Sequence, residues 1–496
     1  MKMPKSISNW ISIMGALLAI NSFILIVILF VQALFSQHQN PYNGMFTFII
    51  LPTILVIGLI MIPVGMLIKR LRTREDDQRW PILDMNNSRQ RQKLIVVSIF
   101  IFLFLIVSAV GSYEAFNYTE SVEFCGKLCH KVMEPEHTTY LHSPHARVAC
   151  VECHVGEGAN WYVKSKLSGL YQVYSVIFNK YSRPIETPLK NLRPARETCE
   201  RCHWPQKFYA RKLRSQRTYL TDSLNTEWNF SLMMKIGPSL SPMGLKEGIH
   251  WHINPDVRIE YVASTRDRET IPWVKMTNIK TGDVQIFQDT ENVVDKKSLD
   301  TLEHRIMDCM DCHNRPSHSY KSAMVYTDNA MISGAVPKDL PFIKKVAMNV
   351  LKGPFTNKDS ALRYISDSIT NFYRMGYPSI YAEKKASVEK AIKGIQDEFV
   401  LNVFPYMRVS ASSYLNHIGH LESDGCFRCH SGKHKSDKGK IISKDCNMCH
   451  TIVAQGSSSN MQYTTMDKEM EFVHPIDVKD NWKTYFCTEC HRILYP

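Results

Sequence analysis

The sequence predicts a mainly α-helical fold that is anchored in a membrane by its N-terminal part. Three apolar runs, at about 11–35, 45–68 and 94–111, approach or exceed the roughly 20 residues that a membrane-spanning helix needs. All 14 cysteines follow the third run, and they form seven pairs in which the second cysteine is always followed by His. The 496 residues are enough for two or three domains.

The three apolar runs lack the polar stripe of a helix that packs on a soluble domain. Lys2 and Lys5 precede the first run, residues 36–44 contain no Lys or Arg, and residues 69–93 are strongly basic. The positive-inside rule therefore predicts a cytoplasmic N-terminus and export of everything after the third run. The first run is too long for a cleavable signal peptide, and two more runs follow it.

Six of the cysteine pairs read C-x-x-C-H, and the first pair has three residues between its cysteines. C-x-x-C-H is the attachment motif of c-type haem, in which the thiols form thioethers and the His becomes the proximal iron ligand. The predicted attachment cysteines are Cys125, Cys129, Cys150, Cys153, Cys199, Cys202, Cys309, Cys312, Cys426, Cys429, Cys446, Cys449, Cys487 and Cys490. The predicted proximal ligands are His130, His154, His203, His313, His430, His450 and His491.

Zinc sites and disulfides also use paired cysteines, but neither requires a His after every second cysteine. The sequence therefore predicts seven covalently bound haem c groups and a bacterial inner-membrane protein whose haem segments are periplasmic. The formal charge of +13 suggests nucleic acid or anionic lipid as a partner. Two propionates on each haem would offset this charge, so we expect membrane lipid but no nucleic acid as a partner.

Eleven further histidines follow the third apolar run, about as many as bis-His ligation of seven haems needs. Bis-His haems are closed to substrates, which favours electron transfer. The distal candidates that lie close to a motif are His145, His318, His420, His434 and His474. The other candidates are His137, His142, His250, His252 and His304, with His417 as a spare. In an extended segment His250 and His252 would point to the same face. Met133 is either a ligand of the first haem or a hydrophobic side chain.

The motifs divide the chain after the anchor, residues 1–112. Four motifs fall in 113–330 and three in 416–496, which predicts a tetrahaem domain and a trihaem module. Period-two alternation at 257–263 and a turn at 280–283 predict a small β insertion within about 205–300. Apolar residues at helical spacing predict a helical bridge over 331–415, either a docking surface or a connector with an ordinary core.

Three elements carry a family resemblance: Thr119–Cys125 directly after the third run, Ser143-Pro144-His145, and Cys309–His318. Over about 95–325 the chain resembles the NapC/NirT family of membrane-anchored quinol dehydrogenases, including NrfH-like tetrahaem domains. The extra spans and motifs resemble the heptahaem inner-membrane cytochromes of metal-reducing bacteria. This resemblance implies oxidation of menaquinol from the quinone pool and electron delivery to periplasmic c-type cytochromes in anaerobic, extracellular respiration.

The resemblance also implies a quinol site beside the first haem. The family has a Lys and an acidic residue six positions apart after the second motif; here Lys166 and Gln172 match, with Lys164 as a register alternative. Lys166 would hydrogen-bond a quinol oxygen; the alternative is that both lysines pair with propionates. Glu114, Glu157 or a propionate would accept the proton. The family motif C-x-x-C-H-x-M is stretched here, because Met133 is the third residue after its His.

Other functions also fit a membrane-bound multihaem chain. It would be the electron-donor subunit of a periplasmic nitrite or nitrate reductase, a haem-based terminal reductase with an open iron site, or a conduit without a quinol site. A reductase would need a haem that binds substrate.

Overall fold

The structure is a computed structural model that describes residues 9–35, 50–72, 85–127, 130–155, 159–189, 192–208, 210–237, 248–353, 355–465 and 468–494. The chain divides into two compact units, each described by itself. Unit 1 comprises Met1–Met133 with Ala149–Val151, and unit 2 comprises Glu134–Val148 with Glu152–Pro496. The division falls inside the second cysteine motif.

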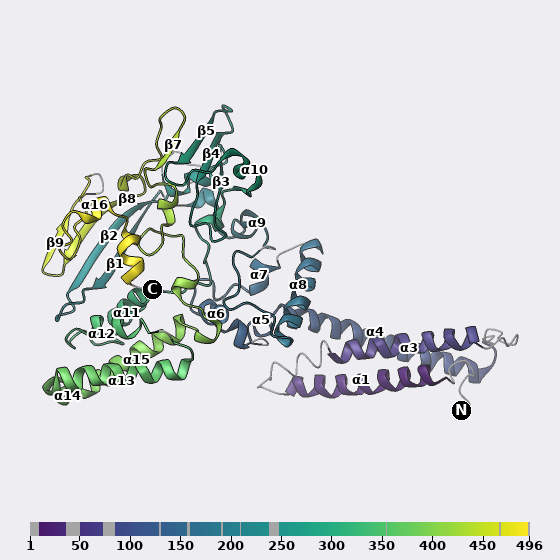
Figure 1. Cartoon of the computed structure of the whole chain (residues 1–496). Coiled ribbons are helices and arrows are strands. Elements are labelled where there is room, and N and C mark those ends of the chain that lie inside the picture. Colours follow the sequence, from purple (N-terminus) through teal and green to yellow (C-terminus); the bar gives the residue numbers. More distant parts are fainter. Residues whose placement is uncertain are drawn as a thin grey trace. The chain divides into compact units, whose positions relative to one another are not determined.

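Unit 1 contains three long apolar helices (Figure 1), namely α1 (Trp10–Phe35), α3 (Leu51–Arg72) and α4 (Ser88–Glu120). Each of the three is long and apolar enough to cross a membrane. The third helix continues past residue 111, where its apolar run ends, to Glu120. It is followed by the short helix α5 (Val122–Lys127), which contains Cys125. The chain therefore runs from an apolar helix almost directly into the first motif.

Helices α1 and α3 pack against each other through small residues. A Cβ atom on Gly15 would lie 2.6 Å from the Gly58 carbonyl oxygen, and one on Gly58 would lie 2.7 Å from that of Gly15. Ser12 donates a hydrogen bond of 2.8 Å to the Ile62 carbonyl. Close backbone approach through small residues is typical of helix pairs in membranes.

Most helices that contain a cysteine motif in unit 2 are short, and longer helices lie between the fourth and the fifth motif. The helices that include residues of unit 2 are α6 (His130–Leu141), α7 (Cys150–His154), α8 (Ala159–Ile177), α9 (Ala195–Cys199), α10 (Lys296–Thr301), α11 (Ala323–Ile332), α12 (Ile343–Val350), α13 (Lys358–Gly376), α14 (Pro378–Glu383), α15 (Lys385–Asn402), α16 (Asn481–Thr484) and α17 (Cys487–Leu494). The 3-10 helices are η2 (Pro205–Lys207), η3 (Ile249–Ile253), η4 (Cys309–Asp311), η5 (Pro405–Met407), η6 (Ala411–Ser413), η7 (Gly425–Arg428) and η8 (Cys446–Met448).

Unit 2 also contains two antiparallel sheets (Figure 1). The strands are β1 (Arg211–Tyr219), β2 (Glu227–Lys235), β3 (Val257–Val262), β4 (Trp273–Asn278), β5 (Val284–Asp289), β6 (His304–Ile306), β7 (His434–Ser436), β8 (His450–Ser457) and β9 (Asn460–Tyr463). Their order is β1-β2-β8-β9 in one sheet and β6-β3-β4-β5-β7 in the other. The strand at 257–262 and the hairpin turn after Asn278 confirm the period-two prediction.

The β structure extends beyond the predicted insertion. Strand β2 pairs with β8 from Trp228↔Ser457 to Met234↔His450, and β5 pairs with β7 at Phe287↔Ser436. Each sheet thus combines strands of the 205–300 region with strands that follow residue 416. Backbone hydrogen bonds join the segments that the sequence predicts as separate modules.

The main apolar core lies among α11, α12, α13 and α15. The fully buried residues Ile365, Ile369, Ile395 and Phe399 belong to it, at the helical spacing that the sequence shows. On two helices of this core, α12 and α11, lie Lys344 and Asp328. Lys344 is 1% exposed, and its Nζ lies 2.6 Å from Asp328 Oδ1. Asp328 also accepts hydrogen bonds from Thr218 and from the backbone N–H of Tyr219 in β1, which ties the helices to the first sheet.

Candidate haem-binding sites

Three of the C-x-x-C-H motifs fold as single helical turns. The backbone N–H of His203, His313 and His430 donates to the carbonyl of the first cysteine of its own motif, at 2.8, 2.8 and 2.9 Å. Residues i, i+3 and i+4 share one face of a helical turn. The two thiols and the imidazole of a C-x-x-C-H motif therefore point to the same side, as attachment to one haem requires.

Six of the motif imidazoles face a second imidazole. The ring centroids are separated by 5.9 Å for His203 and His145, 6.3 Å for His154 and His318, 6.3 Å for His313 and His250, 5.8 Å for His430 and His252, 6.2 Å for His450 and His420, and 6.3 Å for His491 and His474. A metal–imidazole bond is about 2.0 Å long and a ring nitrogen lies about 1.1 Å from its ring centre, so two imidazoles on opposite sides of one iron have centres about 6 Å apart. The six spacings fit an iron between each pair of rings.

Hydrogen bonds at Nδ1 orient several of the second imidazoles. Nδ1 of His145 lies 3.1 Å from the backbone carbonyl oxygen of Pro316. Nδ1 of His318 lies 3.0 Å from the backbone carbonyl oxygen of Glu136, and Nδ1 of His252 lies 2.8 Å from that of Ile249. His250 and His474 make similar contacts with Ile236 and Ile476. A carbonyl at Nδ1 fixes the tautomer and leaves Nε2 with its lone pair for a metal.

Burial lowers the pKa of several of these imidazoles and so favours their neutral form. It lowers the pKa of His318 to about 4, with a smaller contribution from His154, and the pKa of His450 to about 4, with a smaller contribution from His420. Burial also lowers the pKa of His252. Iron binds the neutral imidazole, so burial favours the ligand form of these three side chains.

Three of the remaining candidate histidines use Nε2 for a contact within the protein. Nε2 of His434 lies 2.7 Å from the Ile271 carbonyl, that of His304 3.1 Å from the Leu299 carbonyl, and that of His417 3.1 Å from Glu269 Oε1. His142 is exposed, and His137 lies in α6. The structure therefore places His252, and not His434, opposite His430.

His250 and His252 differ from the expectation for an extended segment. Both lie in the 3-10 helix η3, so their rings point in different directions and face two different motifs. Their proximity to a motif is created by folding alone, because no cysteine pair lies near them in the sequence.

The thiols show how the motifs follow one another. Within unit 1, a hydrogen bond from the Cys125 thiol is the main cause that lowers the pKa of Cys150 to about 7. Within unit 2, Cys309 hydrogen-bonds Cys199 and raises its pKa, and Cys153 adds a smaller effect. After burial itself, Cys426 contributes to the raised pKa of Cys312 and of Cys449. Cys446 likewise contributes to the raised pKa of Cys487. Motifs that follow each other in the sequence therefore have neighbouring thiols.

The described residues fit haem rather than zinc or disulfides. None of the described cysteines forms a disulfide, and the described residues contain no group of three or more His, Cys, Asp or Glu arranged to hold a metal ion. The buried Nε atoms of Arg193 and Arg315 have no hydrogen-bond partner within the described part of the chain. Guanidinium groups of this kind suit haem propionates, which are planar carboxylates.

The first motif is described only in part. Cys129 lies outside the described residues, and the side chain of His130 is not described, so its axial partner stays a prediction. Met133 lies in α6, one helical turn after His130, and is half-buried.

The predicted quinol-site residues lie on α8. Lys166 is half-buried, whereas Lys164 and Gln172 are exposed; Lys164 Nζ lies 4.9 Å from the Trp161 ring, and Gln172 donates to Ser168 at 3.4 Å. The same helix exposes an apolar stripe formed by Leu167, Leu170, Tyr171, Tyr174 and Ile177. At 3.6 residues per turn these positions span about 120° of the helix, and Lys164 and Lys166 border the stripe on its two sides. The sequence reading did not identify this stripe, although its i, i+3, i+4 spacing is the signal for it. Of the proposed proton acceptors, Glu114 lies in α4 and Glu157 lies outside the described residues.

These features define a membrane-anchored c-type cytochrome that binds several haems covalently and transfers electrons. Residues 87–188 match the model of the NapC/NirT cytochrome c family, N-terminal region. The chain is 42% identical over 488 residues to cytochrome c-type protein ImcH of Geobacter sulfurreducens, which covers 97% of this chain and 95% of that protein. It is 30% identical to cytochrome c-type protein NrfH of Wolinella succinogenes over 102 residues. This aligned stretch covers 20% of this chain and 57% of that protein. No solved structure matches the chain.

The chain therefore belongs to the NapC/NirT cytochrome c family and is an ImcH-type cytochrome of the inner membrane.

Proposed function

We propose that this cytochrome is a menaquinol dehydrogenase of the bacterial inner membrane that binds seven haem c groups and delivers electrons to periplasmic c-type cytochromes in anaerobic respiration. The observation that carries the proposal is the pairing of six motif histidines with a second histidine at 5.8–6.3 Å. When bound, the haems supply one-electron transfer, and the protein provides their position and electrostatic surroundings.

In this proposal six irons would each be held by a motif histidine and by a second histidine, which is His145, His318, His250, His252, His420 or His474. Two protein ligands would leave no open position on an iron for a substrate. The pairing therefore favours electron transfer over a terminal reductase at these six sites. Met133 is the proposed ligand of the first haem.

Basic residues support the proposed topology. Lys69 and Arg72 lie at the end of α3, and Arg89, Arg91 and Lys93 lie at the start of α4. The positive-inside rule places these helix ends in the cytoplasm. The opposite end of α4 and the first motif after it then lie at the periplasmic surface.

Helix α8 supports the proposed quinol site. Its exposed apolar stripe with lysines at both borders is the pattern of a helix that lies in a membrane interface, where an apolar face enters the lipid and the ammonium groups stay at the headgroups. Lys166 would donate a hydrogen bond to a quinol oxygen at this depth. Its positive charge would lower the pKa of the quinol hydroxyl and so promote loss of the proton that accompanies oxidation.

The test is quinol oxidation by a Lys166→Ala variant, with Lys385→Ala in the exposed part of α15 as the matched control. We expect the Lys166 variant to lose most of its reduction by a menaquinol analogue, because a hydrogen-bond donor and a charge are removed from the site. Oxidation of the chemically reduced variant by a soluble cytochrome should be unchanged, since the path beyond the quinol is intact. Unchanged quinol turnover with full haem content would contradict the proposed site.

A further inference from the structure

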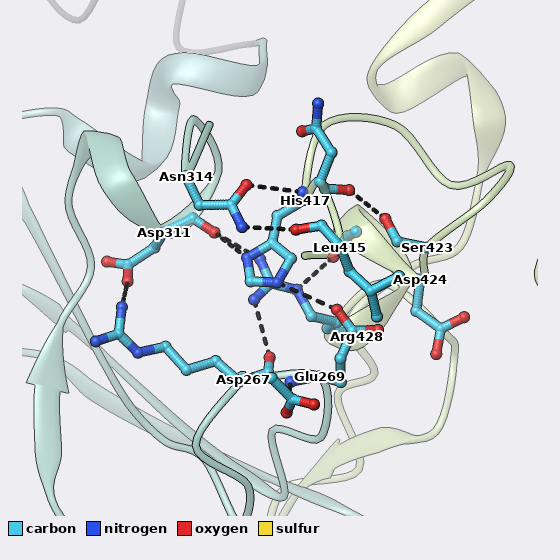
Figure 2. A network of polar contacts seen from close by, with 12 residues as sticks. Asp267, Glu269, Asp311, Asn314, Leu415, His417, Ser423, Asp424 and Arg428 are labelled. Carbon is cyan, nitrogen blue, oxygen red and sulfur yellow. Dashed lines mark hydrogen bonds and ion pairs between the residues drawn. The ribbon is translucent and has the colours of Figure 1, made fainter. Parts of the chain in front are cut away.

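A buried polar network joins residues of two haem motifs (Figure 2). It is called the junction network here and consists of Glu269, Asp311, Asn314, His417 and Arg428. Asp311 lies inside the Cys309–His313 motif and Asn314 directly follows it, whereas Arg428 lies inside the Cys426–His430 motif. The network therefore connects the last motif of the first group with the first motif of the second group.

Arg428 makes the direct link between the two attachment loops. Its side chain is 9% exposed and donates to three carbonyl oxygens: Gly425 at 2.8 Å, Arg268 at 3.0 Å and Asp311 at 2.7 Å. One guanidinium thus holds its own loop, the segment that follows β3, and the preceding motif. The planar guanidinium, with five donors in fixed directions, satisfies all three carbonyls.

Asp311 is itself fixed in place. Its side chain is 1% exposed and accepts hydrogen bonds from Tyr261 at 2.6 Å, Arg305 at 2.6 Å and Arg268 at 3.1 Å. These contacts anchor the Cys309–His313 loop to β3 and β6. Arg428 therefore donates to a residue whose side chain is itself held by three hydrogen bonds.

His417 and Asn314 extend the link, and Figure 2 shows His417 between Asn314 and Glu269. Nδ1 of His417 lies 3.3 Å from the Asp311 carbonyl, and its backbone N–H donates to Asn314 at 3.0 Å. Glu269, which faces His417, also pairs at 3.0 Å with Arg492, the residue after the seventh motif. The seventh motif is thereby attached to the same network.

The two loops are also held from a second direction. The 3-10 helix η3 carries His250 opposite His313 and His252 opposite His430, at 6.3 and 5.8 Å between ring centroids. The two haems proposed for this junction would share the five-residue element η3, and the Arg428 link joins their attachment loops. This double attachment leaves little freedom between them.

The charge of Arg428 reaches both attachment loops. The Arg428 side chain belongs to the Cys426–His430 loop, and its guanidinium lies 2.7 Å from the Asp311 carbonyl oxygen of the Cys309–His313 loop. A cation in a buried, low-dielectric position favours the form of a neighbouring redox centre that carries one more electron. The acidic groups nearby are matched by other cations, Asp311 by Arg268 and Arg305, and Glu269 by Arg492.

We propose that Arg428 is a positioning residue that locks the haem-attachment loop Cys426–His430 onto the loop Cys309–His313, and that its buried charge raises the reduction potentials of the two haems at this junction. The inference rests on the proposed haem attachment at these two motifs but not on the quinol site. It assigns a role to Arg428, which is one of the two x residues of its C-x-x-C-H motif, where the motif allows any amino acid.

The test is a redox titration of the purified full-length protein, followed by absorbance and by electron paramagnetic resonance. Three variants are compared: Arg428→Met, Arg428→Lys, and the control Arg374→Met, an exposed Arg of α13. In Arg428→Met we expect two of the haem transitions to shift to lower potential, because the buried cation is lost. In Arg428→Lys we expect a smaller potential shift but an altered low-spin spectrum, because an ammonium group cannot reach all three carbonyls in the same geometry.

Arg374→Met should match the unmodified protein in both measurements. If Arg428→Met does not assemble, Arg428→Lys decides: unchanged spectrum and unchanged potentials overturn the proposal. Full haem content with unchanged transitions in both Arg428 variants also overturns it. Loss of the proposed attachment is a separate result, because mass spectrometry of the unmodified protein would then find no haem on the Cys309 and Cys426 motifs.

Discussion

At the scale of single residues, the ring nitrogen that a histidine leaves free decides which role it can take. Where Nδ1 meets a backbone carbonyl, as in His145 and His252, Nε2 is available to a metal. Where Nε2 itself meets a carbonyl, as in His434 and His304, the ring is used by the protein. Sequence proximity to a motif does not by itself decide this choice, because His434 lies close to a motif and uses Nε2 within the protein.

The assignment of His252 predicts a specific change in one haem. In His252→Met we expect unchanged haem content, because attachment depends on cysteines, and a higher reduction potential for one haem, because thioether ligation raises haem potentials. Redox titration and electron paramagnetic resonance of the purified variant measure both effects.

Two matched variants sharpen this prediction. His304→Met changes an exposed ring, and His434→Gln keeps a donor for the Ile271 carbonyl, so neither should alter any haem transition. A shifted transition in His434→Gln together with an unchanged His252→Met would reverse the assignment.

Glu398 predicts a pH dependence of stability. Burial raises the pKa of Glu398 above its ordinary value of 4.5, with Lys321 and His142 opposing. At pH values between 4.5 and the raised pKa of Glu398, the folded chain binds more protons than the unfolded chain. Stability should therefore fall as pH rises through this window, and Glu398→Gln should remove that part of the slope. Thermal unfolding midpoints across the window, with the exposed Glu389→Gln as control, check this; equal slopes would show that Glu398 makes no such contribution.

At the scale of elements, close helix approach depends on single glycines. A Cβ on Gly394 in α15 would lie 2.6 Å from the Ala335 carbonyl oxygen, whereas one on Gly376 at the end of α13 would meet nothing within 4 Å. Both positions are helical, so the intrinsic gain from Gly to Ala, roughly 0.5–1 kcal/mol, is comparable.

This contrast predicts opposite outcomes for two identical substitutions. Gly394→Ala should lower the unfolding midpoint, because relieving the overlap costs about 1–3 kcal/mol. Gly376→Ala should leave the midpoint unchanged or raise it slightly. Thermal unfolding of both variants measures the difference, and a Gly394 variant as stable as the parent would show that α15 can move away from Ala335 at no cost.

Helix α8 shows how an element acquires function from its surroundings. Its exposed stripe would be costly in water and is favourable in a membrane interface. The proposed quinol ligand Lys166 borders that stripe, so the helix that would bind the lipid would also carry the proposed site.

At the scale of the whole molecule, the two groups of haem motifs are joined by sheets, not by a linker alone. Strands β7, β8 and β9 complete sheets that begin in the 205–300 region, and Arg428 bonds to the backbone of the fourth motif. The tetrahaem and trihaem segments predicted from motif spacing therefore share their hydrogen bonds and, at η3, their proposed ligands.

This sharing predicts the result of a truncation. A chain that ends at residue 415 would leave β2 and β5 with unpaired edges and remove Arg428 and its contacts. We expect such a chain to be degraded or to lose haem from its remaining motifs, measured by haem staining and limited proteolysis against the full-length protein. A stable truncated chain with intact low-spin spectra in its four remaining motifs would mean that the segments fold independently.

Much of the architecture could be predicted from local patterns. Apolar runs near 11–35 and 94–111 predicted α1 and α4, and helical spacing at Ile365 and Ile369 predicted α13, because burial against lipid or a core follows the period of the element. Five distal candidates were singled out as close to a motif, and four of them face a motif ring. The exception, His434, lies close in sequence but is turned toward Ile271.

The sequence by itself determined the covalent chemistry and the anchor, because a C-x-x-C-H turn and an apolar helix are local: a few adjacent residues contain everything they need. Only the tertiary structure decided which second imidazole meets each motif, that β8 completes the sheet of β2, and that Arg428 bonds to Asp311. These contacts join residues that are not neighbours in the chain, and they depend on strand pairing and burial that no local pattern encodes.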